Sequence, residues 1–172
     1  RERVVSGVSK TAPSGEQKAV AKVSCFRSRD PERWVKDIST FNTVDMGEVY
    51  KGIRLNLQAR GNNVEKIFHI RPTADPNKIR LRIEGAKALK LTPEGELEVH
   101  TRAGRMRFSK PMAYQTAGGR KTLVDVAYKI MGNAYGFQVG AYDQTKELFI
   151  DPLITAIFTG STDETTRPSC MA

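Results

Sequence analysis

The sequence has few of the residues from which reactive centres are built. Its 172 residues include two cysteines, Cys25 and Cys170, and two histidines, His69 and His100. No Cys-x-x-Cys or related metal-ligand spacing is present, and the cysteines lie at opposite ends of the chain. Each histidine sits among strand-forming residues without clustered carboxylates, so we interpret both as ordinary strand residues. We therefore predict no metal site and no cofactor.

Catalytic motifs are also missing. An enzyme would need converging acids, a nucleophile with its base, or a metal cluster. The acidic residues are scattered singly among lysines and arginines, and no glycine-rich phosphate loop precedes a helix. The sequence therefore supplies no catalytic residues, and we predict that the protein is not an enzyme.

Long apolar runs and a leader segment are absent from the sequence. No window approaches the roughly 18 apolar residues of a membrane-spanning helix, so no membrane span is predicted. The chain begins at Arg1, without a charged segment followed by an apolar one. Two interpretations stay open: a signal segment has been removed, or the chain is a fragment of a larger precursor.

Positive charge is abundant. Lysine and arginine total 28 against 19 aspartates and glutamates, which gives a net charge of +9. Such a surface attracts polyanions in a salt-sensitive way, although a soluble face rich in lysine and arginine is the simpler interpretation. A candidate polyanion-binding patch is formed by Arg80, Arg82, Arg105 and Arg107, with acidic polysaccharide or extracellular DNA as ligand. Glutamates interrupt this patch and aromatic residues do not interleave it, so sequence-specific DNA recognition is not indicated.

The clearest structural signal is an alternation of apolar and charged residues over residues 77–115. Within residues 78–84 the aliphatic side chains of Ile79, Leu81 and Ile83 fall on one face of a strand. The pattern resumes at 96–101 and 105–108, and further strands are expected at 17–26, 40–45, 52–59, 64–71 and 153–158. Strands at this spacing, with glycine-rich turns between them, predict an all-β fold, either an antiparallel β-sandwich or an open barrel.

One short helical turn is expected near residues 31–37. Asp30 is a suitable N-cap and Pro31 suits the first helical position. We expect this turn to present Trp34, the sole tryptophan, to the core as a packing anchor. The predicted organisation is an extended N-terminal arm at 1–16, a β-sandwich domain at 17–158 and a polar C-terminal tail at 159–172.

Six short motifs in the chain occur together, in one order, in a known type of domain. They are DPERW at 30–34, VYKGI at 49–53, ADPNKIRL at 74–81, EGA at 84–86, KPMAYQ at 110–115 and LFIDP at 148–152. As an ordered set they resemble the β-rich domain of unknown function that precedes the repeats of bacterial SBBP (seven-bladed β-propeller) repeat proteins. The resemblance covers about residues 22 to 160. Residues 159–164 resemble the opening of a first repeat, and no propeller follows.

The resemblance implies an exported, extracellular or cell-surface protein, and it supplies no catalytic residues to transfer. In such a protein an even number of cysteines favours a disulfide between Cys25 and Cys170, with two unrelated thiols as the alternative. We expect a structural or adhesive domain. Relative to the domain that it resembles, the chain lacks upstream strands. Residues 1–8 or 153–158 could therefore be donated to a neighbouring copy and build a fibre, whereas in the competing arrangement they fold back into their own domain.

Overall fold

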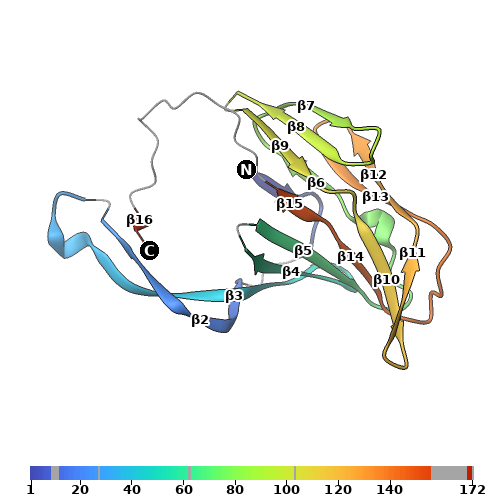
Figure 1. The fold of residues 1–172 in the computed structure, drawn as a ribbon, viewed down its shortest axis with the longest axis horizontal. Coiled ribbons are helices and arrows are strands. Elements are labelled where there is room, and N and C mark those ends of the chain that lie inside the picture. The colour runs from blue at the N-terminus through green and yellow to red at the C-terminus, as the bar shows by residue number, and fades with distance from the viewer. Residues whose placement is uncertain (9–11, 27, 62, 103, 156–169, 172) are drawn as a thin grey trace.

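The computed structural model describes residues 1–8, 12–26, 28–61, 63–102, 104–155 and 170–171. Two antiparallel sheets face each other, and a long two-stranded hairpin extends away from them (Figure 1). Almost every element is a strand, which confirms the predicted all-β class. The sheets do not close into a barrel, so the architecture is that of a sandwich.

The smaller sheet has four strands. Their order is β1 (Glu2–Val4), β6 (Leu81–Ile83), β13 (Ala134–Val139) and β12 (Val126–Met131). The N-terminal strand β1 therefore lies beside a strand some eighty residues later in the sequence, with Glu2 opposite Ile83 and Val4 opposite Leu81.

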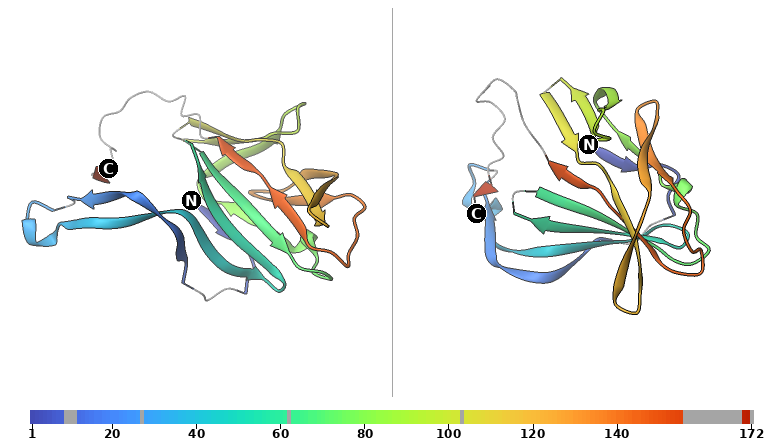
Figure 2. Two further views of the ribbon diagram at one scale, coloured as in Figure 1. Left: turned by 60° about the horizontal axis from the view of Figure 1, so that its bottom comes forward. Right: turned by 45° about the vertical axis from the view of Figure 1, so that its right-hand side comes forward.

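The larger sheet has twelve strands and branches at β5. Its main path is β16 (Cys170–Met171), β2 (Ser14–Cys25), β3 (Val35–Tyr50), β4 (Ile53–Arg60), β5 (Asn63–Ile70), β15 (Leu153–Thr155), β9 (Gly104–Phe108), β8 (Leu97–Thr101) and β7 (Ala86–Leu91). From β5 the branch continues through β14 (Leu148–Asp151) and β10 (Met112–Ala117) to β11 (Arg120–Val124). The chain passes from the larger sheet to the smaller one twice among the described strands, between β5 and β6 and between β11 and β12 (Figure 2).

The core lies between the inner faces of the two sheets. Phe68 of β5 meets Phe137 of β13 with ring centroids 5.6 Å apart, and Phe108 of β9 meets Tyr135 of β13 at the same separation. The predicted inward residues Ile79, Leu81 and Ile83 are all buried in this core. The predicted inward face is therefore correct, but the strand expected at 78–84 is shorter: β6 is Leu81–Ile83, and Ile79 follows a 3-10 turn at Pro76–Lys78.

The helical turn forms where expected, but Trp34 does not reach the core. Pro31–Arg33 is a 3-10 turn in which the Asp30 carboxylate accepts the Glu32 backbone N–H at 3.0 Å. The Trp34 ring packs edge-to-face on Phe26, with centroids 5.0 Å apart, and its Nε1 donates to the Ser28 carbonyl at 2.7 Å. These contacts are at the tip of the β2–β3 hairpin. The prediction of a core anchor is therefore wrong, and Trp34 anchors only this tip.

The predicted N-terminal arm is part of the domain. Glu2–Val4 forms a strand of the smaller sheet, Val5 N–H donates to the Arg80 carbonyl at 2.9 Å, and β2 already begins at Ser14. Of the predicted strand at 153–158, residues 153–155 form β15, whereas 156–158 lie outside the described residues. The predicted tail at 159–172 also lies outside them, except for the backbone of β16.

Gly136 gives a test of the packing between β13 and the chain segment before β6. A Cβ atom there would lie 2.2 Å from the Ile79 carbonyl oxygen and 3.1 Å from Met131 Cε. Because backbone must move to relieve this clash, we expect Gly136→Ala to lower the free energy of unfolding by about 1–3 kcal/mol. Urea denaturation measures this value. Gly118→Asn is the control, since nothing lies within 4 Å of that site and asparagine tolerates its left-handed backbone. Equal losses in the two variants would contradict the packing argument.

Candidate functional site

The hairpin formed by β2 and β3 extends beyond the sandwich as an arm. The strands are 12 and 16 residues long, and β3 pairs with β4 only from Thr43 onward. We use "hairpin arm" for the described residues 14–26 and 28–42, which include β2, the 3-10 turn and the first part of β3. None of the described residues of the arm belongs to the hydrophobic core, and β3 contributes to it only near its end, through Met46, Val49 and Tyr50. The left view in Figure 2 shows the far part of this hairpin extending beyond the sandwich, while its base continues the larger sheet.

Apolar side chains are exposed on the hairpin arm. Of the ten exposed large hydrophobic residues in the described chain, five belong to the arm: Val20, Phe26, Val35, Ile38 and Phe41. Val20 is fully exposed and Val35 is 55% exposed. An isolated two-stranded hairpin is marginally stable in water, and clustered exposed apolar groups mark interaction sites. The arm is therefore the strongest candidate contact surface in the fold.

The two cysteines come together at the end of β2. In the antiparallel pairing of β16 with β2, Cys170 lies opposite Cys25 and Met171 opposite Ser24. Directly opposed residues in such a pair have Cα atoms about 4.5–5.5 Å apart, within the separation that a disulfide requires. The backbone arrangement supports the predicted disulfide, which stays a prediction.

The four predicted arginines do not form one patch. Arg82 lies between the buried residues Leu81 and Ile83 in the smaller sheet, so it points to the outer face of that sheet. Arg105 and Arg107 are on β9 of the larger sheet and alternate with the partly buried Met106 and the buried Phe108. Since the two sheets pack through their inner faces, these arginines face away from Arg82. The predicted patch is therefore divided between opposite surfaces.

Arg105 and Arg107 are also largely neutralised. Glu98 lies across from them on β8, and its carboxylate is 3.7 Å from Arg105 Nη1 and 3.4 Å from Arg107 Nη2. His100 Nε2 also contacts the Glu98 carboxylate. Although burial acts in the opposite direction, His100 and the two arginines together lower the pKa of Glu98. The positive charges of this cluster are partly balanced by the Glu98 carboxylate, which makes it a poor site for a polyanion.

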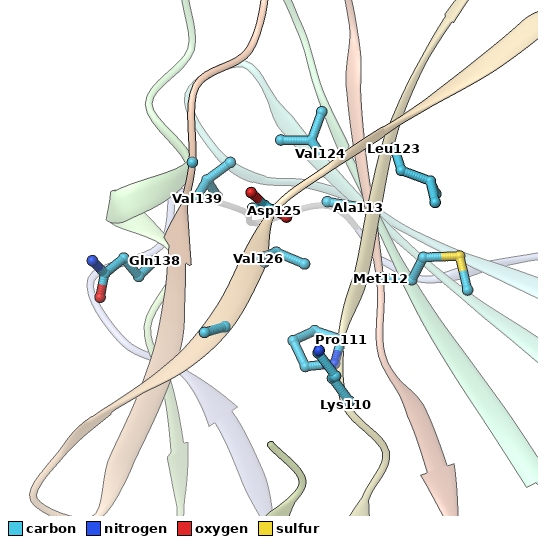
Figure 3. Close-up of a pocket in the computed structure, with 12 residues that line it drawn as sticks. Lys110, Pro111, Met112, Ala113, Leu123, Val124, Asp125, Val126, Gln138 and Val139 are labelled. Carbon is cyan, nitrogen blue, oxygen red and sulfur yellow. The ribbon is translucent and has the colours of Figure 1, made fainter. Parts of the chain in front are cut away.

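A pocket of about 510 Å³ lies where the chain crosses from β11 to β12 (Figure 3). Its walls are mainly apolar and include Val124, Val126 and Val139, with Met112 and Leu123 exposed beside it. Asp125 occupies the crossing itself, and its carbonyl accepts the Gly140 N–H at 2.8 Å. Lys110 and Asp125 are the ionisable residues of its lining, and the other lining residues are mostly apolar, so this pocket suits an apolar group.

A second pocket, of about 600 Å³, lies at the C-terminal end of β6. Its lining combines three cationic residues and one acid with apolar surface. The lining residues are Arg1, Glu84, Gly85, Ala86, Lys87, Thr101, Arg102 and Met106. We call it the cationic pocket. Its charge distinguishes it from the apolar pocket of Figure 3.

A buried charged cluster joins the two sheets. Lys66 Nζ on β5 lies 2.7 Å from both carboxylate oxygens of Glu2 on β1 and 2.7 Å from the Tyr135 hydroxyl. The same ammonium lies 4.6 Å from the centre of the Phe108 ring. Burial lowers the pKa of Lys66 against the opposing effect of Glu2, and burial raises the pKa of Tyr135 well above its usual range. All three groups are engaged with one another, so the cluster fastens β1 to the core.

The histidines occupy separate outer-face positions. His69 on β5 packs edge-to-face on Phe149, which stacks on Tyr114, and Lys121 Nζ lies 4.2 Å from the centre of the Tyr114 ring. All three aromatic residues of this row are half-buried. Burial lowers the pKa of His69. No group of three or more metal-ligating residues occurs in the part of the chain that the structure describes.

Sequence reasoning missed two features: the contact between Glu2 and Lys66, and the cationic pocket. In each of them, residues meet that are far apart along the chain. The exposed arm had a detectable signal, since residues 19–23 and 35–41 carry apolar side chains without a regular alternation.

Among the described residues, both helices are three-residue 3-10 turns, and no helix has the length and apolar character needed to cross a membrane.

Comparison with known proteins identifies the family. The sequence matches the family described as Domain of unknown function (DUF7948) over residues 3–153, which is most of the chain. The chain belongs to this family. No curated protein and no solved structure matches it significantly. The match spans β1 to the start of β15, so the hairpin arm and the sandwich are both parts of the family domain.

Proposed function

We propose that this DUF7948 domain is a non-catalytic structural domain that associates with further copies of itself through the hairpin arm. The observation that carries the proposal is the exposure of Val20, Phe26, Val35, Ile38 and Phe41 on an element that has no core beneath it. Burying these side chains against another protein removes apolar surface from water, which favours association.

The size of the arm indicates how strong such an association can be. A 12-residue strand is about 40 Å long, and two paired strands are about 10 Å wide, so one face of the arm covers roughly 400 Å². A standard stable interface buries about 800 Å² per partner. The arm alone supplies about half of that area. We therefore propose a weak, concentration-dependent contact in which the arm also touches the sandwich of the partner copy.

The arm replaces strand donation as the route to assembly. Residues 2–4 pair with β6 of their own chain, and residues 153–155 pair with β5 and β9 of their own chain. The segments expected to be donated thus fold back into the domain that carries them. The hairpin arm, in contrast, carries exposed apolar side chains and extends beyond its own sandwich (Figure 1).

We propose an extracellular or cell-surface location for this assembly. Two observations support it: the ordered motifs that resemble the domain preceding SBBP repeats, and the placement of Cys170 opposite Cys25, which suits a disulfide formed in an oxidising compartment. In this setting the domain would act as a structural or adhesive module.

Substitutions on the arm test the proposal. We expect the sedimentation coefficient of the wild-type protein to rise with concentration, and that of Val20→Lys/Val35→Lys to stay at the monomer value, because two charges then oppose burial of the arm. The matched control is Val8→Lys/Val64→Lys, which changes two valines that are 59% and 41% exposed outside the arm. This control should associate like the wild type. A wild-type protein that stays monomeric at all concentrations, or equal effects of the two pairs, would refute the proposal.

A further inference from the structure

The cationic pocket has a fixed frame. One wall is the paired end of β1 and β6, where Glu84 N–H donates to the Arg1 carbonyl at 2.7 Å and the Arg1 backbone nitrogen donates to the Glu84 carbonyl at 3.2 Å. The other wall is the sheet of β7, β8 and β9, in which Ala86 lies opposite Thr101 and Thr101 opposite Gly104. Because both walls are held by backbone pairing, the pocket is preorganised.

The charge of the pocket is positive. Its lining includes Arg1, Lys87 and Arg102 but only one acid, Glu84, and that carboxylate is already 2.7 Å from Arg3 Nε outside the lining. Among the described residues, Lys87 and Arg102 form no ion pair. Arg105 and Arg107, in contrast, form ion pairs: Arg105 with Glu98, and Arg107 with both Glu96 and Glu98. An anionic group that enters the pocket therefore meets two cations, Lys87 and Arg102, that no described carboxylate pairs with.

From this geometry we propose that the cationic pocket binds acidic saccharides, meaning sugar units that carry carboxylate or sulfate groups. Arg102 and Lys87 contact the anionic groups, and the Glu84 carboxylate accepts hydrogen bonds from sugar hydroxyls. Ala86 and Met106 give the apolar surface on which a sugar ring packs. The volume of about 600 Å³ lies in the range of small-ligand sites.

The lining favours a saccharide over a nucleic acid. Single-stranded nucleic acids are held by aromatic side chains on which bases stack, and the residues that line this pocket include no aromatic residue. The site is also far smaller than a groove that follows a phosphate backbone. This inference does not depend on self-association, because none of the lining residues belongs to the hairpin arm.

Calorimetric titration with a heparin-derived tetrasaccharide, in low salt and at protein concentrations where the chain is monomeric, tests the site. We expect binding that weakens as salt is raised. Lys87→Ser/Arg102→Ser should weaken binding at least about tenfold, because charge-assisted hydrogen bonds are lost. Arg120→Ser/Lys129→Ser is the matched control, since it removes one lysine and one arginine at exposed positions outside the pocket. It should change the affinity by less than about threefold.

Three results would overturn the inference. The first is no binding of the tetrasaccharide by the wild-type protein in low salt. The second is equal weakening by the two variant pairs, which would mean that net charge alone holds the ligand. The third is tighter binding of a single-stranded oligonucleotide of equal charge, which would assign the pocket to nucleic acid. Failure of the arm variants to affect self-association would leave these outcomes unchanged, so the two proposals are tested separately.

Discussion

Replacing Glu2 by alanine is expected to lower the free energy of unfolding by about 3 kcal/mol, the lower end of what loss of one partner costs a buried ion pair. The side chain of Lys66 is only 4% exposed, and Glu2 supplies its sole carboxylate contact among the described residues. Without Glu2 the ammonium keeps only the Tyr135 hydroxyl as a hydrogen-bond partner. Urea denaturation at neutral pH measures the loss.

Two controls separate the buried charge from the position of Glu2 near the terminus. Arg3→Ala, on the same short strand, removes a half-exposed ion pair with Glu84 and should cost less than about 1 kcal/mol. The double substitution Glu2→Leu/Lys66→Met should recover most of the lost stability, because apolar residues of similar volume can replace a buried pair. If Arg3→Ala lowers the free energy of unfolding as much as Glu2→Ala does, the explanation is wrong, because backbone pairing and not the buried charged cluster would then hold β1.

The Glu2→Ala variant should also respond to pH in a defined direction. Burial places the pKa of Lys66 below its value in the unfolded chain, which is about 10.4. Between these two pKa values the unfolded chain binds more protons than the folded one, so stability rises with pH across that window. Glu2→Ala should therefore regain part of its stability as the solution is made alkaline. A parallel pH dependence in Arg3→Ala would contradict this explanation.

Breaking the predicted disulfide between Cys25 and Cys170 is expected to have the largest effect on stability. The bond would close a loop of more than a hundred residues, for which the chain-entropy model gives at most about 4–5 kcal/mol. Denaturation with and without reductant measures the difference, and Cys25→Ser/Cys170→Ser should match the reduced wild type. Intact mass after alkylation without reductant tests the bond itself. Two alkylated thiols in freshly isolated protein would show that it does not form, and a dimer-sized mass would show a link between chains.

Local sequence patterns predicted the strands but not the long-range contacts of the fold. The pattern of apolar residues placed Ile79, Leu81 and Ile83 in the core, and the strands expected at 52–59 and 64–71 form β4 and β5, which pair with each other. The same pattern showed that Arg82, Arg105 and Arg107 face solvent, but not that they lie on opposite outer faces. Which sheet a strand joins depends on pairing between distant segments, and a single strand does not carry that information.

The errors concerning Trp34 and the N-terminal residues have a common cause. A tryptophan after a capped turn was expected to pack into the core, yet the hairpin that carries it extends beyond the sandwich, where the tryptophan ring contacts Phe26 and Lys36 Nζ. Residues 1–16 are mostly polar and small, so they resembled a detached arm, but residues 1–5 carry contacts to the sandwich. They are held instead by pairing with β6 and by the contact between Glu2 and Lys66, which lie 64 residues apart in the sequence. Neither partner could be inferred from local composition.

Hydrogen–deuterium exchange at low and high protein concentration tests the central claim most directly. If the hairpin arm is the surface through which copies associate, amides of β2 and residues 35–42 should exchange more slowly at high concentration, because contact with a partner reduces local opening. Core amides of β5 and β13 should exchange at the same rate in both samples. Unchanged exchange in the arm, in a sample whose sedimentation shows association, would contradict the account, because assembly would then proceed through another surface.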